Sequence, residues 1–315
     1  MQKIDGNFSG KDILSISQFT PSDIQKLFTY SDVIRNKIEA GEHIDVLRGY
    51  IMASLFYEPS TRTSSSFVAA MQRLGGGFIP INDVHYSSVS KGENLSDTVR
   101  TLENYADVIV LRHHDRGHAK IAADASVKPI INAGDGIGEH PTQALLDLYT
   151  IQHEFGHLDN LEVTMVGDLK NGRTVHSLAQ LLAMFGARLN YVSPKSLQMP
   201  RSITMQLDSQ GVVQSHALSL DSVIETSDVL YVTRVQKERF DKVAEYNAVK
   251  DLFILTANTM KKVKKAAIVM HPLPRVNEIH PEVDGDRRAV YFSQVKNGLY
   301  VRMALLSLVL GKEIS

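Results

Sequence analysis

Residues 107–155 read DVIVLRHHDRGHAKIAADASVKPIINAGDGIGEHPTQALLDLYTIQHEF and contain two short apolar runs and one long helical pattern. The runs at 107–111 and 129–132 are rich in Val and Ile, which favours β-strands, and a polar loop follows each of them. The pattern Pro141–Phe155 predicts a helix that Gly156 terminates. Near-continuous apolar strands that alternate with helices indicate a parallel sheet covered on both faces.

The same alternation extends to both sides of this stretch. Further strand-like runs lie at 50–57, 78–81, 161–166, 188–192, 212–217, 228–232 and 267–270. Helical patterns lie at 21–40, with Thr20 as N-cap and Pro21 in the first turn, and at about 63–74, 174–185 and 296–310. We therefore predict an α/β fold of two domains, each a parallel sheet flanked by helices, which the helix 141–155 joins. Residues 1–150 form the first domain, which a C-terminal helix (about 296–315) completes by packing back on it, and residues 151–295 form the second.

The composition narrows the class of protein. The chain has 315 residues, 43% of them hydrophobic and 22% charged, with a net charge of −1, so we expect a globular protein that binds no nucleic acid. It has no cysteine, which excludes disulfides, thiolate zinc sites and cysteine nucleophiles. The polar start MQKIDGNFSGKDILS is unlike a signal peptide and no apolar run reaches ~20 residues, so we expect a cytoplasmic protein without membrane contact. The lysine run at 261–265 is interpreted as a solvated helix face.

Cationic residues follow the predicted strands. In open parallel sheets, ligands bind beyond the carboxyl ends of the strands. The segments at these ends contain Arg62, Arg112, His140, Arg173, Arg234 and Arg275. So many cations at one predicted rim of a nearly neutral protein indicate substrates with several negative charges.

The segment Ser60-Thr61-Arg62-Thr63 lies where a predicted strand turns into a helix. The first N–H groups of a helix are unpaired and carry partial positive charge, so they bind phosphate. The hydroxyls add donors and Arg62 adds a planar, two-pronged grip. Simple capping of the helix by Ser or Thr is an open alternative.

Other motifs are absent or ambiguous. The chain has no G-x-x-x-x-G-K-[ST] loop, and residues 166–173 lack the G-x-G-x-x-G pattern of dinucleotide folds. The polar loop 82–94 is either an ordinary surface loop or a lid that carries Lys91 to an anion. His113, His114 and His118 lack a regular ligand spacing, so we expect no metal.

Seven motifs occur in order: STRT, SxxxKGE, LRH, HPTQ, GDLKxGRTxHS, TRVQKER and HPLPR. Together, over about residues 50–305, they resemble the catalytic chains of the aspartate carbamoyltransferase family. The resemblance implies an enzyme without a cofactor that transfers the carbamoyl group of carbamoyl phosphate to L-aspartate in pyrimidine biosynthesis. It also implies a homotrimer with active sites shared between subunits, and zinc-bearing regulatory chains as further partners.

The resemblance implies a role for each motif residue. The phosphate ligands would be Ser60, Thr61, Arg62 and Thr63. The donors to the carbamoyl oxygen would be Thr63, Arg112 and His140, and the carbamoyl NH2 would be held by Gln143 and the carbonyls of Leu273 and Pro274. The carboxylates of aspartate would bind Arg173, Arg234 and Gln236, while Ser87 and Lys91 would come from the neighbouring subunit and Lys91 would touch both substrates. The catalytic residues would be Arg62, Thr63, Arg112, His140 and Lys91, because fixed donors stabilise the negative charge that grows on the carbonyl oxygen.

Three alternatives stay open. A carbamoyltransferase for ornithine typically has HCLP where this chain has His271-Pro272-Leu273-Pro274, and a cationic acceptor would require carboxylates where Arg173 and Arg234 stand. A non-catalytic anion-binding homologue would be expected to lose some of these positions. A dehydrogenase is disfavoured by the missing glycine pattern.

Overall fold

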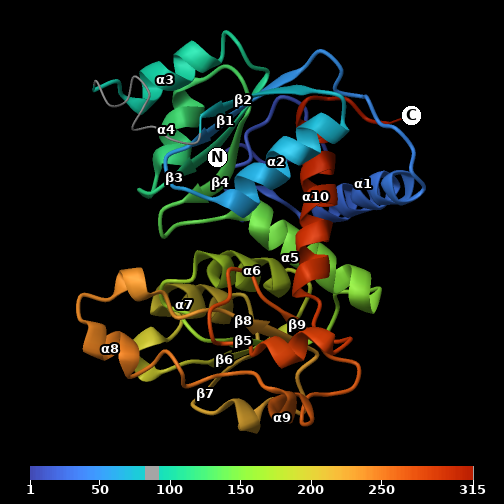
Figure 1. Ribbon diagram of the computed structural model, residues 1–315. Coiled ribbons are helices and arrows are strands. Elements are labelled where there is room, and N and C mark those ends of the chain that lie inside the picture. The colour runs from blue at the N-terminus through green and yellow to red at the C-terminus, as the bar shows by residue number, and fades with distance from the viewer. Residues whose placement is uncertain (82–91, 315) are drawn as a thin grey trace. The chain divides into compact units, whose positions relative to one another are not determined.

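The computed structural model describes residues 1–81 and 92–314, which form two compact units (Figure 1). Unit 1 comprises Met1–Tyr149 and Lys296–Ser315, and unit 2 comprises Thr150–Val295. No helix of the described residues is long and apolar enough to cross a bilayer.

Unit 1 is built on a four-stranded parallel sheet in the order β2-β1-β3-β4. The strands are β1 (Ile51–Phe56), β2 (Gly77–Ile81), β3 (Val108–His113) and β4 (Ile130–Asp135). The helices within it are α1 (Pro21–Glu39), α2 (Thr61–Arg73), α3 (Leu95–Leu102) and α4 (His118–Ala125). Leu55, Ile109 and Ile130 form a core cluster with α3 and α4, while α1 and α2 lie on the other side of the sheet (Figure 1). The sheet is therefore covered on both faces, as its continuous apolar strands predict.

Unit 2 contains a five-stranded parallel sheet in the order β7-β6-β5-β8-β9. The strands are β5 (Glu162–Val166), β6 (Arg188–Val192), β7 (Gln214–Ala217), β8 (Val229–Val232) and β9 (Ile268–Met270). The helices are α6 (Arg173–Ala183), α7 (Arg201–Ser209), α8 (Val243–Asn247) and α9 (Ala257–Met260). The predicted α/β class with two parallel sheets is thus confirmed.

Strand order locates a switch point in each sheet. The chain leaves β1 for β2 on one side and later returns to β3 on the other, and β5 has the same relation to β6 and β8. At such a point the loops leave two adjacent strands in opposite directions and open a crevice at the carboxyl edge. The segments after β1, β3, β5 and β8 are therefore the places where each unit is expected to bind ligands.

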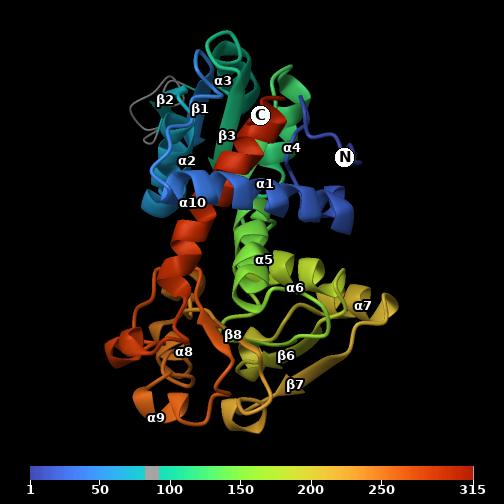
Figure 2. The same cartoon turned by 90° about the vertical axis from the view of Figure 1, so that its right-hand side faces the viewer.

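Two long helices belong partly to each unit: α5 (Pro141–Phe155) and α10 (Tyr291–Val309), seen from a second side in Figure 2. From Lys296 onward, α10 is part of unit 1, where Lys296 Nζ lies 2.9 Å from Glu39 Oε1 and Arg302 binds Ser66 of α2. The C-terminal helix thus packs on the first unit, as predicted. It begins five residues earlier than expected, because its first turn lies in unit 2.

The helical interpretation of the lysine run is wrong. The short helix α9 ends at Met260, and the lysines that follow are exposed but lie in turns. The guanidinium of Arg288 donates to the carbonyl oxygens of Met260 and Val263 at 2.8 and 2.6 Å. These carbonyls are therefore capped by a side chain distant in sequence, so the helix is not continued.

Gly167, directly after β5, lies against the backbone of Thr233, directly after β8. A Cβ there would lie 2.2 Å from the carbonyl oxygen of Thr233, and the residue has a φ of +111°. We expect Gly167→Ala to lower the free energy of unfolding of unit 2 by about 3 kcal/mol, because both the clash and the conformation oppose it. Urea unfolding measures this. Gly186→Ala, also at positive φ but with open space around it, is the control and should cost only about 1 kcal/mol; equal losses would contradict the steric argument.

Candidate active site

The segment after β1 forms the start of α2. Ser60 is the N-cap, and its Oγ accepts a hydrogen bond from the N–H of Thr63 at 3.4 Å. The helix begins at Thr61, two residues before the predicted start, so Thr61 and Arg62 occupy its exposed first turn while Thr63 is buried. Capping accounts for Ser60 but not for the cation beside it. The first turn offers N–H groups, hydroxyls and a guanidinium in one place, which suits an anion.

Arg112 lies near the end of β3 and is buried. Its Nη2 donates to Glu58 Oε1 at 2.8 Å, and its Nη1 donates to the carbonyl oxygen of Ala133 at 3.3 Å. Glu58 follows β1 and Ala133 belongs to β4, so the guanidinium of Arg112 is fixed by groups from the two strands on either side of β3. This places a rigid cation at the switch point of unit 1.

His140 and Gln143 stand at the start of α5. His140 is buried, with Nδ1 3.5 Å from Thr142 Oγ1. Gln143 is partly exposed, and its Nε2 donates to Asp147 Oδ1 at 2.8 Å. Together with Ser60–Thr63 and Arg112 these residues make up the unit 1 site, which follows β1, β3 and β4.

In unit 2, Arg173 and Arg234 follow the two strands of the switch point. Arg173 is the first residue of α6, after a loop in which the buried carboxylate of Asp168 accepts from the N–H of Asn171 at 3.0 Å. Arg234 follows β8 and is held by both carboxylate oxygens of Glu238, with Nη1 3.1 Å from Oε2. Each partner stabilises the other's charge: the hydrogen bonds to Glu238 raise the pKa of Arg234, and those from Arg234 lower the pKa of Glu238.

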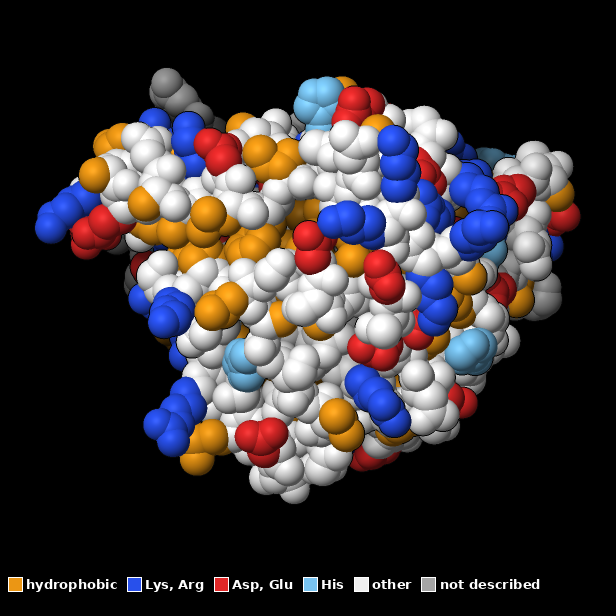
Figure 3. Space-filling model, turned by 90° about the horizontal axis from the view of Figure 1, so that it is seen from below, with side chains coloured by type: hydrophobic (Ala, Val, Ile, Leu, Met, Phe, Trp, Pro, Cys, Tyr) orange, Lys and Arg blue, Asp and Glu red, His pale blue; other side chains and the backbone are white. Residues whose placement is uncertain are grey.

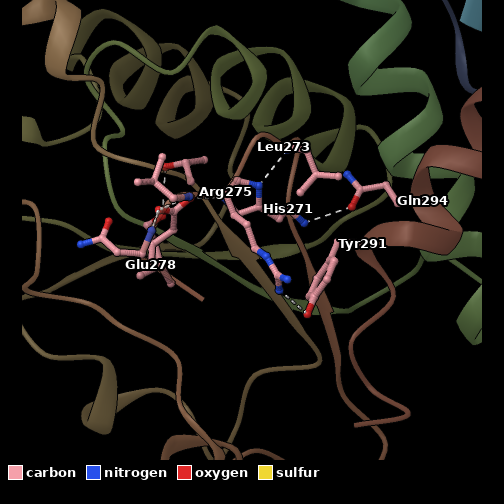
Figure 4. A network of polar contacts seen from close by, with 10 residues as sticks. His271, Leu273, Arg275, Glu278, Tyr291 and Gln294 are labelled. Carbon is pink, nitrogen blue, oxygen red and sulfur yellow. Dashed lines mark hydrogen bonds and ion pairs between the residues drawn. The ribbon is translucent and has the colours of Figure 1, made fainter. Parts of the chain in front are cut away.

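The loop after β9 is held by a buried polar network (Figure 4). The N–H of Leu273 donates to His271 Nδ1 at 2.7 Å, so His271 carries its proton on Nε2 and donates it to Glu278 Oε1, also at 2.7 Å. The backbone N–H of His271 donates to Gln294. Leu273 has a φ of +54° and is followed by a cis bond to Pro274. These contacts fix the carbonyls of Leu273 and Pro274. Arg173, Arg234 and Gln236 make up the unit 2 site.

Arg275, by contrast, is engaged in contacts with other side chains of unit 2 and is not one of the predicted substrate ligands. Its guanidinium binds the carboxylate of Asp284, donates to Tyr291 Oη at 3.1 Å and lies over the ring of Phe292. It therefore joins the loop after β9 to the start of α10. Of the six cations at predicted strand ends, the structure places Arg62, Arg112 and His140 in unit 1 and Arg173, Arg234 and Arg275 in unit 2.

Sequence reasoning missed the carboxylates of both sites. Glu58, Asp147, Glu238 and Glu278 each bind a residue of interest, yet none was singled out. The spacing i,i+4 could have identified the pairs Gln143–Asp147 and Arg234–Glu238, since such residues are neighbours where the chain is helical or turns tightly. Ser87 and Lys91, the other two predicted ligands, lie outside the described residues.

One group of side chains in the described part of the chain brings three metal-ligating atoms together: His113, Asp115 and His118. The two imidazoles stack 3.8 Å apart and within 7° of parallel. Their in-plane lone pairs therefore do not converge on one ion. Burial, together with the neighbouring rings of His118 and His114, lowers the pKa of His113 to about 4, so the imidazole of His113 is neutral at pH 7. The geometry favours ring stacking over a preassembled metal site.

A separate pocket of about 330 Å³ lies beyond the carboxyl ends of β6 and β7 in unit 2. Leu218, Leu220 and Phe253 line it, and Asp221 is its single charged lining residue. This lining does not suit an anion. The face of the molecule shown in Figure 3 mixes basic and acidic side chains with hydrophobic ones, so cations are not concentrated on it.

Comparisons with known proteins agree with this two-site arrangement. Residues 11–153 match the family description "Aspartate/ornithine carbamoyltransferase, carbamoyl-P binding domain", and residues 159–309 match its "Asp/Orn binding domain". The multifunctional protein pyr1-3 of Dictyostelium discoideum is 52% identical over 98% of this chain, which spans 14% of that protein. The aspartate carbamoyltransferase catalytic subunit of Thermococcus gammatolerans is 48% identical, covering 97% of this chain and 99% of the relative. Aspartate transcarbamoylase of Trypanosoma cruzi, solved with carbamoyl phosphate and aspartate, is 45% identical with a TM-score of 0.92, covering 96% of this chain and 98% of the other.

The His271–Glu278 pair makes stability depend on pH. Burial alone would raise the pKa of Glu278, but hydrogen bonds from His271 and from backbone N–H groups lower it below the usual value. The unfolded chain then binds the proton more tightly, so the contribution of Glu278 is complete above about pH 4.5 and is lost as the pH falls through the lower folded-state pKa.

We therefore expect Glu278→Gln to lose less stability than the wild type between about pH 6 and pH 3.5. Urea unfolding at both pH values measures the difference. Glu245→Gln alters an exposed carboxylate and is the matched control, which should follow the wild type. Parallel curves for Glu278→Gln and the wild type would show that Glu278 is not the titrating group.

Proposed function

The chain belongs to the aspartate/ornithine carbamoyltransferase family, and we propose that it transfers the carbamoyl group of carbamoyl phosphate to the amino group of L-aspartate. The products are N-carbamoyl-L-aspartate and phosphate, and the reaction is a step of pyrimidine biosynthesis. The main observation that supports the proposal is that each sheet has cationic side chains at its switch point. Arg112 in unit 1 and Arg234 in unit 2 are each held by a carboxylate. The chain spans only a small part of its multifunctional relatives, so the proposal concerns this chain's own reaction.

The unit 1 site binds carbamoyl phosphate. Its phosphate group lies at the first turn of α2, where Ser60, Thr61, Arg62 and Thr63 supply N–H groups, hydroxyls and a guanidinium. Thr63, Arg112 and His140 donate to the carbamoyl oxygen. Gln143, with the carbonyls of Leu273 and Pro274, binds the carbamoyl NH2. Both T. cruzi and Thermococcus relatives are named for this reaction, which supports the assignment.

The unit 2 site binds L-aspartate. Arg173 and Arg234 offer two guanidinium groups to its two carboxylates, and Gln236 adds an amide. A cationic acceptor such as ornithine would face like charges, which disfavours it. Glu238 orients Arg234 by a two-pronged contact, so that the guanidinium is already in place when the substrate arrives.

Catalysis is the attack of the neutral amine of aspartate on the carbamoyl carbon. Negative charge grows on the carbonyl oxygen, where the buried guanidinium of Arg112 and the imidazole of His140 are fixed donors. The tetrahedral intermediate then expels phosphate, which takes the amine proton. Because no covalent intermediate is needed, alignment of the two substrates supplies much of the rate enhancement.

The chain works as a homotrimer in the cytoplasm. Ser87 and Lys91 complete the site from the neighbouring subunit, with Lys91 touching both substrates. The Thermococcus relatives are named catalytic subunits, which supports assembly with separate subunits. We propose that these are zinc-bearing regulatory chains.

The first test measures transfer from labelled carbamoyl phosphate to aspartate and, separately, to ornithine. We expect kcat/KM for aspartate to exceed that for ornithine by at least about 10³, because the acceptor site is cationic.

We expect Arg62→Ala to lower turnover with aspartate by about 10²–10³ while the circular dichroism spectrum is unchanged. Arg73→Ala, in the last turn of the same helix and also exposed, is the matched control. Preference for ornithine, or near-normal turnover of Arg62→Ala, would refute the assignment.

The second test concerns the shared site. Arg62→Ala and Lys91→Ala chains should each be inactive, but mixing them with subunit exchange should restore part of the activity. In a mixed trimer some sites receive Arg62 from one chain and Lys91 from another, and so are intact. Mixing each variant with itself is the control. Confirmed exchange without recovered activity would mean that each site is built from one chain.

A further inference from the structure

Gln143 and Asp147 lie one turn apart on α5, with Gln143 Nε2 2.8 Å from Asp147 Oδ1. Asp147 is completely buried. An ionised carboxylate can only accept hydrogen bonds, so the amide of Gln143 must turn its N–H groups toward Asp147. The amide oxygen, Oε1, is then the end that Gln143 offers to a ligand.

A buried arginine lies beside this pair. Arg302 of α10 is only 4% exposed, interacts electrostatically with Asp147, and donates from Nη1 to Ser66 Oγ at 2.8 Å. Burial lowers the pKa of Arg302 to about 10, and Asp147 opposes this shift, so the guanidinium stays charged at pH 7. A buried carboxylate is retained as an anion when such a cation compensates for its charge.

A glycine makes room for the guanidinium. A Cβ at Gly298 would lie 2.9 Å from Arg302 Nη1 and 2.9 Å from Leu146 Cδ2 on α5. The guanidinium also lies over the ring of Phe67, 5.2 Å from its centre. Arg302 is thus enclosed between α2, which carries the phosphate-binding turn, and α5, which carries Gln143.

We propose that Asp147, which interacts electrostatically with the buried Arg302, is a positioning residue that sets the specificity for the donor substrate by fixing the orientation of the Gln143 amide. This rests on the proposed function. The carbamoyl NH2 offers two N–H groups, and Gln143 Oε1 accepts one of them only in the fixed orientation. Acetyl phosphate, which has a methyl group in place of the NH2, leaves that oxygen without a partner. A site built to bind a substrate N–H rejects the analogue that lacks it.

Asp147→Asn tests the proposal. The guanidinium of Arg302 is a donor only, so the new amide turns its oxygen toward Arg302 and its NH2 toward Gln143. The Gln143 amide then reverses and presents N–H groups to the carbamoyl NH2. We expect KM for carbamoyl phosphate to rise at least about tenfold, with KM for aspartate at saturating donor changing less than about twofold. The affinity ratio of carbamoyl to acetyl phosphate, the latter measured as a competitive inhibitor, should shrink by about tenfold.

Binding of inorganic phosphate distinguishes a changed orientation of the Gln143 amide from a general disruption of the site. Inorganic phosphate has no NH2 group, so its inhibition constant should be unchanged in Asp147→Asn. Gly298→Ala, which displaces the guanidinium by its new Cβ, should change the affinity ratio in the same direction. Asp32→Asn is the matched control, since Asp32 accepts from Tyr149 of the same helix but does not contact Gln143.

Three outcomes would overturn the proposal: an unchanged affinity ratio in Asp147→Asn, an equal loss of inorganic phosphate binding, or the same change in Asp32→Asn. In each case a wild type that still carbamoylates aspartate leaves the proposed function intact. A wild type that does not carbamoylate aspartate refutes the proposed function itself.

Discussion

The pairing of a guanidinium with a carboxylate is the interaction on which both sites depend. Glu58 holds Arg112 and Glu238 holds Arg234, each at the carboxyl edge of its own sheet. A free arginine side chain has about 2 kcal/mol of rotamer entropy to lose on binding. A carboxylate that orders the arginine side chain beforehand removes this cost, so the N–H donors are in position before the substrate binds.

The framework of strands and helices was predictable because its signals are local. Each apolar run overlaps a strand, and the run at 188–192 coincides with β6. The helices Pro141–Phe155 and Pro21–Glu39 begin where Pro stands in the first turn. The position of the cationic residues followed from one rule, that parallel strands present their following loops at one edge.

The features that the sequence did not predict depend on contacts between residues that lie far apart in the chain. The pair Arg112–Glu58 requires the register of β1 against β3. The electrostatic interaction of Arg302 with Asp147 requires α10 to pack on unit 1, with Gly298 leaving room for the guanidinium. The lysine run failed to form a helix because Arg288, far along the chain, takes the carbonyls that a further turn would have used. Local patterns contain no information about such partners.

Unit 1 is discontinuous: its final helix is separated from the rest by the whole of unit 2. The buried residues Val301, Arg302 and Leu305 leave the ribosome after the whole of unit 2, so the N-terminal part of unit 1 cannot complete its core before unit 2 has been synthesised. Unit 2, which is continuous in sequence, can fold while the nascent chain still lacks the part of α10 from Lys296 onward. Until then Asp147 has no cation beside it, and the emerging first unit must keep that carboxylate hydrated.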